Sequence, residues 1–193
     1  MREILSLLTG SVLFCSGFCW AAGGSTGITA SEAKELLKAG NSRFIASSAQ
    51  HPNQGMDRRQ LTATEGQKPF VTLLSCSDSR VPPEILFDRG VGDIFVVRVA
   101  GNVANVDQTG SIEYAVDHLG TPLLVVLGHS KCGAVAAVVQ GADLHGNIVP
   151  IARNICPAVA SVRKSNPSVA SDTFMNMVIE ANVWQAIEDI FRT

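Results

Sequence analysis

The sequence contains no cluster of basic residues and carries almost no net charge. Its 193 residues include 15 Lys and Arg against 17 Asp and Glu, which gives a formal net charge of -2 at pH 7. The charges are scattered along the chain, so there is no electrostatic footprint for nucleic acid or for an anionic lipid surface. A small substrate with little or no charge fits this composition better.

Cysteine is scarce, and two of the five cysteines, Cys15 and Cys19, lie in an apolar N-terminal stretch. That stretch runs from Ile4 to Trp20, follows Arg2, and is followed by the small residues 21–24. This order is typical of a secretory signal peptide, predicted here for residues 1–22, and implies a periplasmic or secreted protein. An uncleaved membrane anchor is the alternative, since about 17 apolar residues reach the short limit for spanning a bilayer.

Signal cleavage would leave three cysteines, Cys76, Cys132 and Cys156, in a compartment where disulfides form readily. One disulfide cannot use all three. A disulfide-stapled protein usually has more cysteines in a shorter chain, so a metal site or a reactive thiol is the better interpretation. Cys156 has no predicted role beyond that of a buried or free surface thiol.

Internal repeats and low-complexity segments are also absent, and the length suits one domain over residues 23–193. Residues 31–47 predict one or two amphipathic helices, with a stop near Gly40 and Asn41. Residues 49–67 are polar and without periodicity, which predicts a long connection that runs over the surface or over a partner subunit.

Three short apolar runs, at residues 70–75, 94–99 and 123–127, are rich in β-branched residues and fit strands buried on both faces. Apolar residues repeat at helical spacing within residues 110–119, which predicts a helix between the last two runs. A further helix is expected from Gly133, an irregular or broken helix at residues 150–171, and a final amphipathic helix at residues 173–191. This order predicts an α/β fold with a mainly parallel central sheet flanked by helices and preceded by a helical arm.

Metal-ligand residues follow two of these runs. Cys76 comes directly after the first run, and His129 and Cys132 follow the last. Ligands bind beyond the carboxyl ends of parallel strands, so these residues are expected to meet. Two thiolates and one imidazole suit Zn²⁺, and three protein ligands with an open fourth position are the catalytic pattern. A Cys76–Cys132 disulfide is the alternative.

Asp78 and Arg80 lie beside the first predicted ligand, and their spacing allows a carboxylate to pair with a guanidinium. Without a metal beside them, a solvated ion pair on a turn explains these two residues equally well. Next to zinc, a carboxylate fixed by Arg80 would orient a zinc-bound hydroxide. Released from Arg80, Asp78 would become the fourth zinc ligand and close the site.

Two segments, CSDSRVPPE at 76–84 and GHSKCGAV at 128–135, resemble the signature segments of the β-carbonic anhydrases. The similarity extends through GDIFVVRVAGN at 92–102, SIEYAVDHLG at 111–120 and residues 180–183. It implies zinc on Cys76, His129 and Cys132, with Asp78 and Arg80 at the metal. The implied activity is reversible hydration of CO2 to bicarbonate and a proton.

The plant-like branch of that family has pocket residues at the positions of Gln67, Phe95, Tyr114 and Gly133, which implies an open, water-bound site. The resemblance also implies a homodimer or homotetramer with pocket residues shared between subunits. Two departures stand out. The chain ends at Thr193, before the last strand of the family, and residues 99–102 differ from the usual pocket wall.

The residues are also compatible with two other functions. One is hydrolysis of CS2 or COS on the same fold, which differs mainly in access to the metal. The other is a secreted, non-catalytic zinc or redox protein in which Cys76 and Cys132 alternate between metal and disulfide.

Overall fold

A parallel three-stranded sheet forms the centre of the protein in the computed structural model, which describes residues 26–192. The strands are β1 (Val71–Ser75), β2 (Ile94–Arg98) and β3 (Leu124–Leu127), in the order β2-β1-β3. All three agree with the apolar runs of the sequence, and the predicted α/β class is confirmed. The predicted signal peptide lies outside the described residues and stays a prediction.

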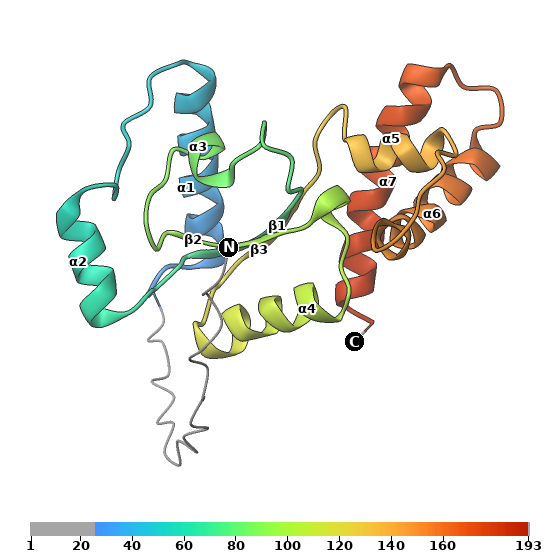
Figure 1. Ribbon diagram of the computed structural model, residues 1–193. Helices are drawn as coiled ribbons and strands as arrows, with labels where there is room; N and C mark the ends of the chain where they lie inside the picture. Colours follow the sequence, from blue (N-terminus) through green and yellow to red (C-terminus); the bar gives the residue numbers. More distant parts are fainter. Residues whose placement is uncertain (1–25, 193) are drawn as a thin grey trace, which may run out of the picture.

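Helices cover both faces of the sheet (Figure 1). Successive strand residues point to opposite faces. Leu73 therefore packs toward α1 (Ala30–Ile45), whereas Leu74 packs toward α4 (Val106–Glu113) and α7 (Ser171–Ile190). Both leucines are fully buried, which explains why the strand reads as a continuous apolar run.

The first helix is a single one, and the expected stop near Gly40 is wrong. It begins after Thr29, which forms a capping box with Glu32. Gly40 lies inside the helix because α1 passes close to α3 (Pro83–Leu86) and the residue that follows it. A Cβ at Gly40 would lie 1.7 Å from the carbonyl oxygen of Phe87. The glycine marks a close approach of two backbones, which the sequence alone does not distinguish from a helix end.

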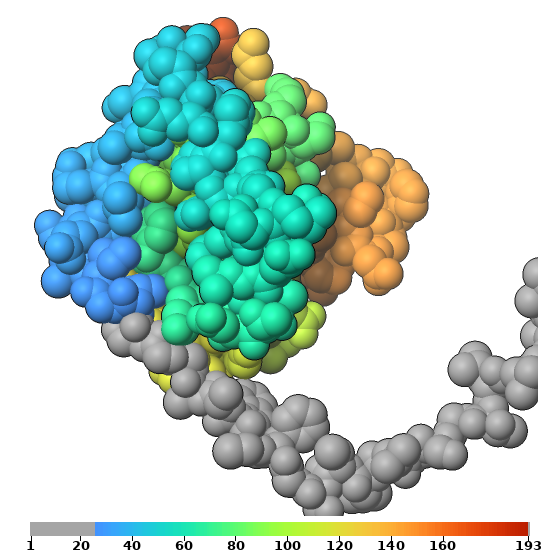
Figure 2. Space-filling view, turned by 90° about the vertical axis from the view of Figure 1, so that its left-hand side faces the viewer, coloured from blue at the N-terminus to red at the C-terminus, as the bar shows by residue number. Residues whose placement is uncertain are grey.

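The polar segment predicted as an open connection contains a helix, α2 (Met56–Glu65), so that prediction is wrong over ten residues. Helix α2 has no buried residue and therefore no apolar periodicity. Tertiary bonds hold it: Arg58 donates to the carbonyl of Val91 and to the carboxylate of Asp93. With α1 and the loop between them, it covers the face shown in Figure 2.

The connection from β2 to β3 runs through a short turn, η1 (Ala100–Asn102), then α4 and a π-helical segment, η2 (Tyr114–His118). The predicted crossover helix is confirmed, although it begins four residues earlier than expected. The π-helical segment brings the ring of Tyr114 to 5.5 Å from that of His118 and 6.0 Å from that of Phe95, between centroids.

Three helices form a second packed region beside the sheet (Figure 1): α5 (Gly133–Val139), α6 (Ile148–Ser165) and α7. The expected start of α5 is confirmed, and α7 begins two residues earlier than expected. The irregular or broken helix expected at residues 150–171 is wrong as far as Ser165, because α6 continues through Pro157 to that residue, and residues 166–170 are irregular as expected. One face of α6 is buried against α7, and this packing outweighs the hydrogen bond that the proline removes. Within residues 26–192, no helix is both long and apolar enough to cross a membrane.

Candidate metal centre

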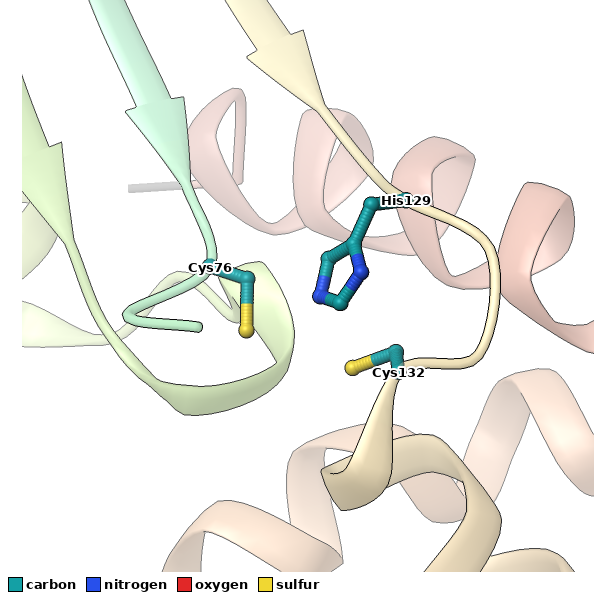
Figure 3. A group of neighbouring side chains, drawn as sticks. All are labelled: Cys76, His129 and Cys132. Atoms are coloured by element: carbon teal, nitrogen blue, oxygen red, sulfur yellow. The ribbon is translucent and has the colours of Figure 1, made fainter. Parts of the chain in front are cut away.

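Three metal-ligand side chains meet at the carboxyl edge of the sheet. Cys76 follows β1, His129 follows β3, and Cys132 is the N-cap of α5 (Figure 3). The two Sγ atoms and a ring nitrogen of His129 all lie within 4.8 Å of one another. Cys76 and Cys132 are buried, and both thiols are free. The structure thus brings together the three ligands predicted from the sequence.

The hydrogen bonds of His129 fit a metal ligand. Its Nδ1 lies 2.9 Å from the carbonyl oxygen of Ser130, which only accepts, so Nδ1 carries the proton. Nε2 therefore presents a lone pair. Among the described residues this buried atom finds no hydrogen-bond partner, although a buried nitrogen normally has one. A zinc ion would satisfy it, and two sulfurs with one imidazole are a donor set that zinc favours.

The thiol of Cys132 is subject to two opposing effects. Burial raises its pKa, as does the neighbouring Cys76, and the backbone N–H groups of Val135 and Ala134 in the first turn of α5 lower it. The helix start therefore lowers this pKa, but burial and Cys76 together outweigh that contribution. A bound cation would reverse the balance, because a coordinating thiol is deprotonated outright.

The predicted Asp78–Arg80 pair is present as a bidentate ion pair. Nε of Arg80 donates to Oδ1 of Asp78 at 2.9 Å, and an Nη donates to Oδ2 at 2.7 Å. These bonds and the backbone N–H of Arg80 hold the pKa of the Asp78 carboxyl far below its usual range. Arg80 also donates to the carbonyl of Lys131, which links the two ligand-bearing loops. Oδ2 of Asp78 lies 3.9 Å from Nε2 of His129, so the carboxylate borders the three ligands.

Sequence reasoning missed residues that hold the first ligand loop. Arg98, the last residue of β2, donates to the carbonyls of Cys76 and Asp78. The backbone N–H of Gly101 donates to Sγ of Cys76 at 3.3 Å, and Asn182 on α7 donates to the carbonyl of Gly101. A signal for Arg98 is available, because a charged residue interrupts an apolar run at a strand end. The backbone donor carries no such signal.

The four predicted pocket residues do not meet within one chain. Gly133 directly follows Cys132, and a Cβ there would meet open space. Phe95 pairs with Thr72 near the start of β1, four residues before Cys76, which is about 13 Å along the strand. Tyr114 packs against Phe95 at that far end of the sheet, and Gln67 precedes β1 on the same side.

Comparisons with known proteins agree with this site. The family model described as carbonic anhydrase matches residues 71–193. Carbonic anhydrase 2 of Mycobacterium tuberculosis is 46% identical over 138 residues, which is 69% of this chain and 66% of that protein, just under two thirds of its length.

Solved structures share the fold as well. A tetrameric β-carbonic anhydrase of Sordaria macrospora is 24% identical with a TM-score of 0.65, over 83% of this chain and 81% of that one. A β-carbonic anhydrase of Aspergillus fumigatus is 27% identical with a TM-score of 0.64, over 83% and 76%. The sequence match, the shared fold and the converging ligands together lead to one conclusion: the chain belongs to the β-carbonic anhydrase family.

Proposed function

We propose that this protein catalyses the reversible hydration of CO2, in which CO2 and water give bicarbonate and a proton. One observation carries the proposal: Cys76, His129 and Cys132 converge at the carboxyl edge of the sheet with the Asp78–Arg80 pair beside them. Family membership and the 46% identity to a mycobacterial carbonic anhydrase support the same activity.

The cofactor we propose is one Zn²⁺ per chain, held by the two thiolates and Nε2 of His129. Bound there, it would lower the pKa of a coordinated water to about 7 and so supply a nucleophile at neutral pH. The donor set and the orphaned Nε2 support zinc.

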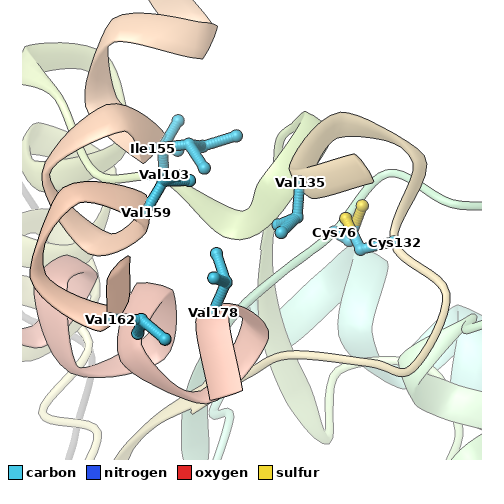
Figure 4. Close-up of a cluster of buried hydrophobic side chains, with 8 residues drawn as sticks. All are labelled: Cys76, Val103, Cys132, Val135, Ile155, Val159, Val162 and Val178. Carbon is cyan, nitrogen blue, oxygen red and sulfur yellow. The ribbon is translucent and has the colours of Figure 1, made fainter. Parts of the chain in front are cut away.

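The chain's own residues prepare this site. Ser130 fixes the tautomer of His129 through its carbonyl. Asp78 is ionised at neutral pH, as an aspartate of ordinary pKa also would be, and Arg80 lowers its pKa further, so it only accepts hydrogen bonds. Its carboxylate therefore orients a donor placed between it and the ligands. Val135 and Val103, buried in the same apolar cluster as both thiols, keep water from the inner side (Figure 4).

We propose further that the working site is open, as in the plant-like branch. Both carboxylate oxygens of Asp78 are engaged by Arg80, and Arg80 is also bonded to Lys131. For Asp78 to act as a fourth ligand, this bidentate pair would have to separate. The geometry therefore supports Asp78 as an acceptor beside the metal over a closed form.

A second copy of the chain is proposed to complete the substrate pocket. Gln67, Phe95 and Tyr114 lie at the amino end of the strands, away from their own chain's ligands. Tyr114 is 37% exposed, and Gln67 is exposed. Their apolar and amide groups suit a CO2 pocket only if another subunit presents them, which supports a homodimer or a homotetramer.

Export to the periplasm or out of the cell is proposed from residues 1–22 alone. The basic start, the apolar stretch and the small residues that follow support a cleaved signal. N-terminal sequencing of the mature protein, with a start near Gly23, is the expected result; an intact Met1 would contradict it.

Stopped-flow CO2 hydration by the zinc-loaded protein tests the activity. The wild type and Cys156→Ser are expected to be active, because Cys156 is exposed and belongs to no ligand set, whereas Cys132→Ser is expected to lose both zinc and activity. Sulfide release from COS or CS2 without CO2 hydration would favour the hydrolase. A Cys76–Cys132 disulfide with no stoichiometric metal would favour the redox protein.

A further inference from the structure

The side chain of Asn182 is a buried amide in an otherwise apolar helix face. It lies on α7 between the buried residues Val178 and Ala186 and is 1% exposed. Its Nδ2 donates to the carbonyl oxygen of Gly101 at 2.8 Å. A buried amide destabilises a fold unless it is hydrogen-bonded, so an apolar residue would serve packing alone better. The bond to Gly101 is what distinguishes this position from its neighbours on the helix.

Gly101 connects this amide to the metal centre. It lies in the turn η1 with φ of 73°, in the left-handed region, and its N–H donates to Sγ of Cys76 at 3.3 Å. A Cβ at Gly101 would lie 2.8 Å from Cδ1 of Ile155 and 3.2 Å from Cβ of Ala134. The turn is therefore wedged between α5 and α6, with Asn182 on its carbonyl and Cys76 on its N–H.

We propose that Asn182 is a positioning residue of the metal centre, acting through Gly101 on the ligand Cys76. By fixing the Gly101 carbonyl, it holds the same residue's N–H against the Cys76 sulfur. An N–H bond draws charge from a ligand sulfur, and such outer partners orient ligands and adjust metal affinity. Figure 4 shows Val178, which lies one turn before Asn182 on α7, as part of the buried cluster that contains both thiols.

This inference rests on the proposed zinc site, and the alternative to it is a purely structural bond. In that case Asn182 ties α7 to the turn and contributes to stability alone. The two roles differ in whether the bond from Asn182 affects the Cys76 sulfur. A structural bond changes the unfolding temperature, whereas a positioning bond also changes the electronic state of the metal–sulfur pair.

The test compares Asn182→Leu and Asn182→Ala with the wild type and with Asn176→Leu. Leucine keeps the branched shape of Asn182 but has no N–H to donate to Gly101 and adds no charge near the thiols. Asn176 lies on an exposed part of the same helix, so Asn176→Leu makes the same chemical change away from the turn. Zinc affinity is measured by chelator competition, and the sulfur-to-metal charge-transfer absorption is measured after loading with Co²⁺.

Both Asn182 variants are expected to bind zinc about 10- to 100-fold more weakly, as for other outer-shell substitutions. Their charge-transfer band is expected to move to lower energy, because a sulfur without its N–H bond holds more charge. Asn176→Leu is expected to match the wild type. Should Asn182→Leu not fold, Asn182→Ser decides instead, since its short hydroxyl does not reach Gly101 and adds no charge.

An unshifted band in folded Asn182 variants, with or without a change in zinc affinity, overturns the positioning role and leaves a structural bond. Zinc binding by the wild type is the separate check on the site itself. A wild-type protein that binds no zinc refutes the proposed function, whereas equal binding and equal spectra in all variants refute only the role of Asn182.

Discussion

Replacing Arg80 by alanine isolates the contribution of the bidentate pair to activity. The substitution removes the donors at 2.9 and 2.7 Å from the two Asp78 oxygens and the bond from Arg80 to Lys131. The backbone N–H of residue 80, 3.0 Å from Oδ1, remains. Asp78 would then keep one of three donors and turn more freely beside His129, 3.9 Å away.

The expected loss in kcat is about 100-fold, at the upper end of the 10- to 100-fold range for groups that orient a metal site, because both side-chain donors are lost together. The kcat of Arg80→Lys should lie between those of the wild type and Arg80→Ala, since an ammonium keeps the charge but cannot form two parallel bonds. The pKa of Asp78 should rise toward its ordinary value of about 3.9, because Arg80 is what lowers it. Asp78 therefore stays ionised at pH 7 in every variant.

Stopped-flow rates from pH 6 to 9, with zinc content measured on each preparation, check this reasoning. The ratio of wild-type to Arg80→Ala rates should remain constant over that range, with zinc content unchanged, because orientation and not protonation is lost. A loss that disappears as the pH rises, or that follows the loss of zinc, would refute the assigned role. Full activity in Arg80→Ala would refute it most simply.

Three further predictions concern stability. Gly40→Ala would place a Cβ 1.7 Å from the Phe87 carbonyl oxygen, so α1 must shift. Chemical denaturation should show that the free energy of unfolding falls by about 1–3 kcal/mol, with zinc affinity unchanged in the folded fraction. An unaltered midpoint would contradict this close approach. The pKa of Asp88 is lowered to about 2, first by the N–H of Gln50 and then by Arg43, so the stability it provides is present above about pH 4 and is lost as the pH falls toward 2. Asp88→Asn should weaken the dependence of stability on pH in this acid range, and an unchanged dependence would refute the role of Asp88. Removal of zinc by a chelator should lower the unfolding temperature, since free zinc at 100 times its Kd contributes about 2.7 kcal/mol; equal unfolding temperatures with and without zinc would contradict a site in the folded state.

The sheet and the metal ligands were predictable because each leaves a side-chain pattern. Strands buried on both faces read as apolar runs, as Leu73 and Leu74 show by packing on opposite faces. Parallel strands end at one edge, so residues directly after two such runs meet. For Cys76 and His129, position in the sequence was therefore enough to predict proximity in space.

Helices held by tertiary bonds escaped prediction. Helix α2 buries no residue, and its position depends on bonds from Arg58 that no local pattern reveals. Helix α6 contains Pro150 and Pro157, which favour a break by local propensity. Pro150 lies in the first turn, where the missing N–H costs little, and burial of one face against α7 carries the helix past Pro157.

At the site, groups belonging to the backbone could not be predicted. The Gly101 N–H and the Ser130 carbonyl contact Cys76 and His129, yet every residue has a carbonyl and nearly every residue an N–H. Only the fold decides which of them reach a ligand. The pocket predicted from the family resemblance is likewise divided between two ends of the sheet, which a linear sequence does not reveal.

The most direct test of the central claim is a titration of CO2 hydration against added zinc, starting from metal-free protein. If Cys76, His129 and Cys132 form one catalytic site per chain, the rate should rise linearly with zinc and level off at one zinc per chain. A rate that is independent of zinc, or no activity at one zinc per chain, would contradict the account.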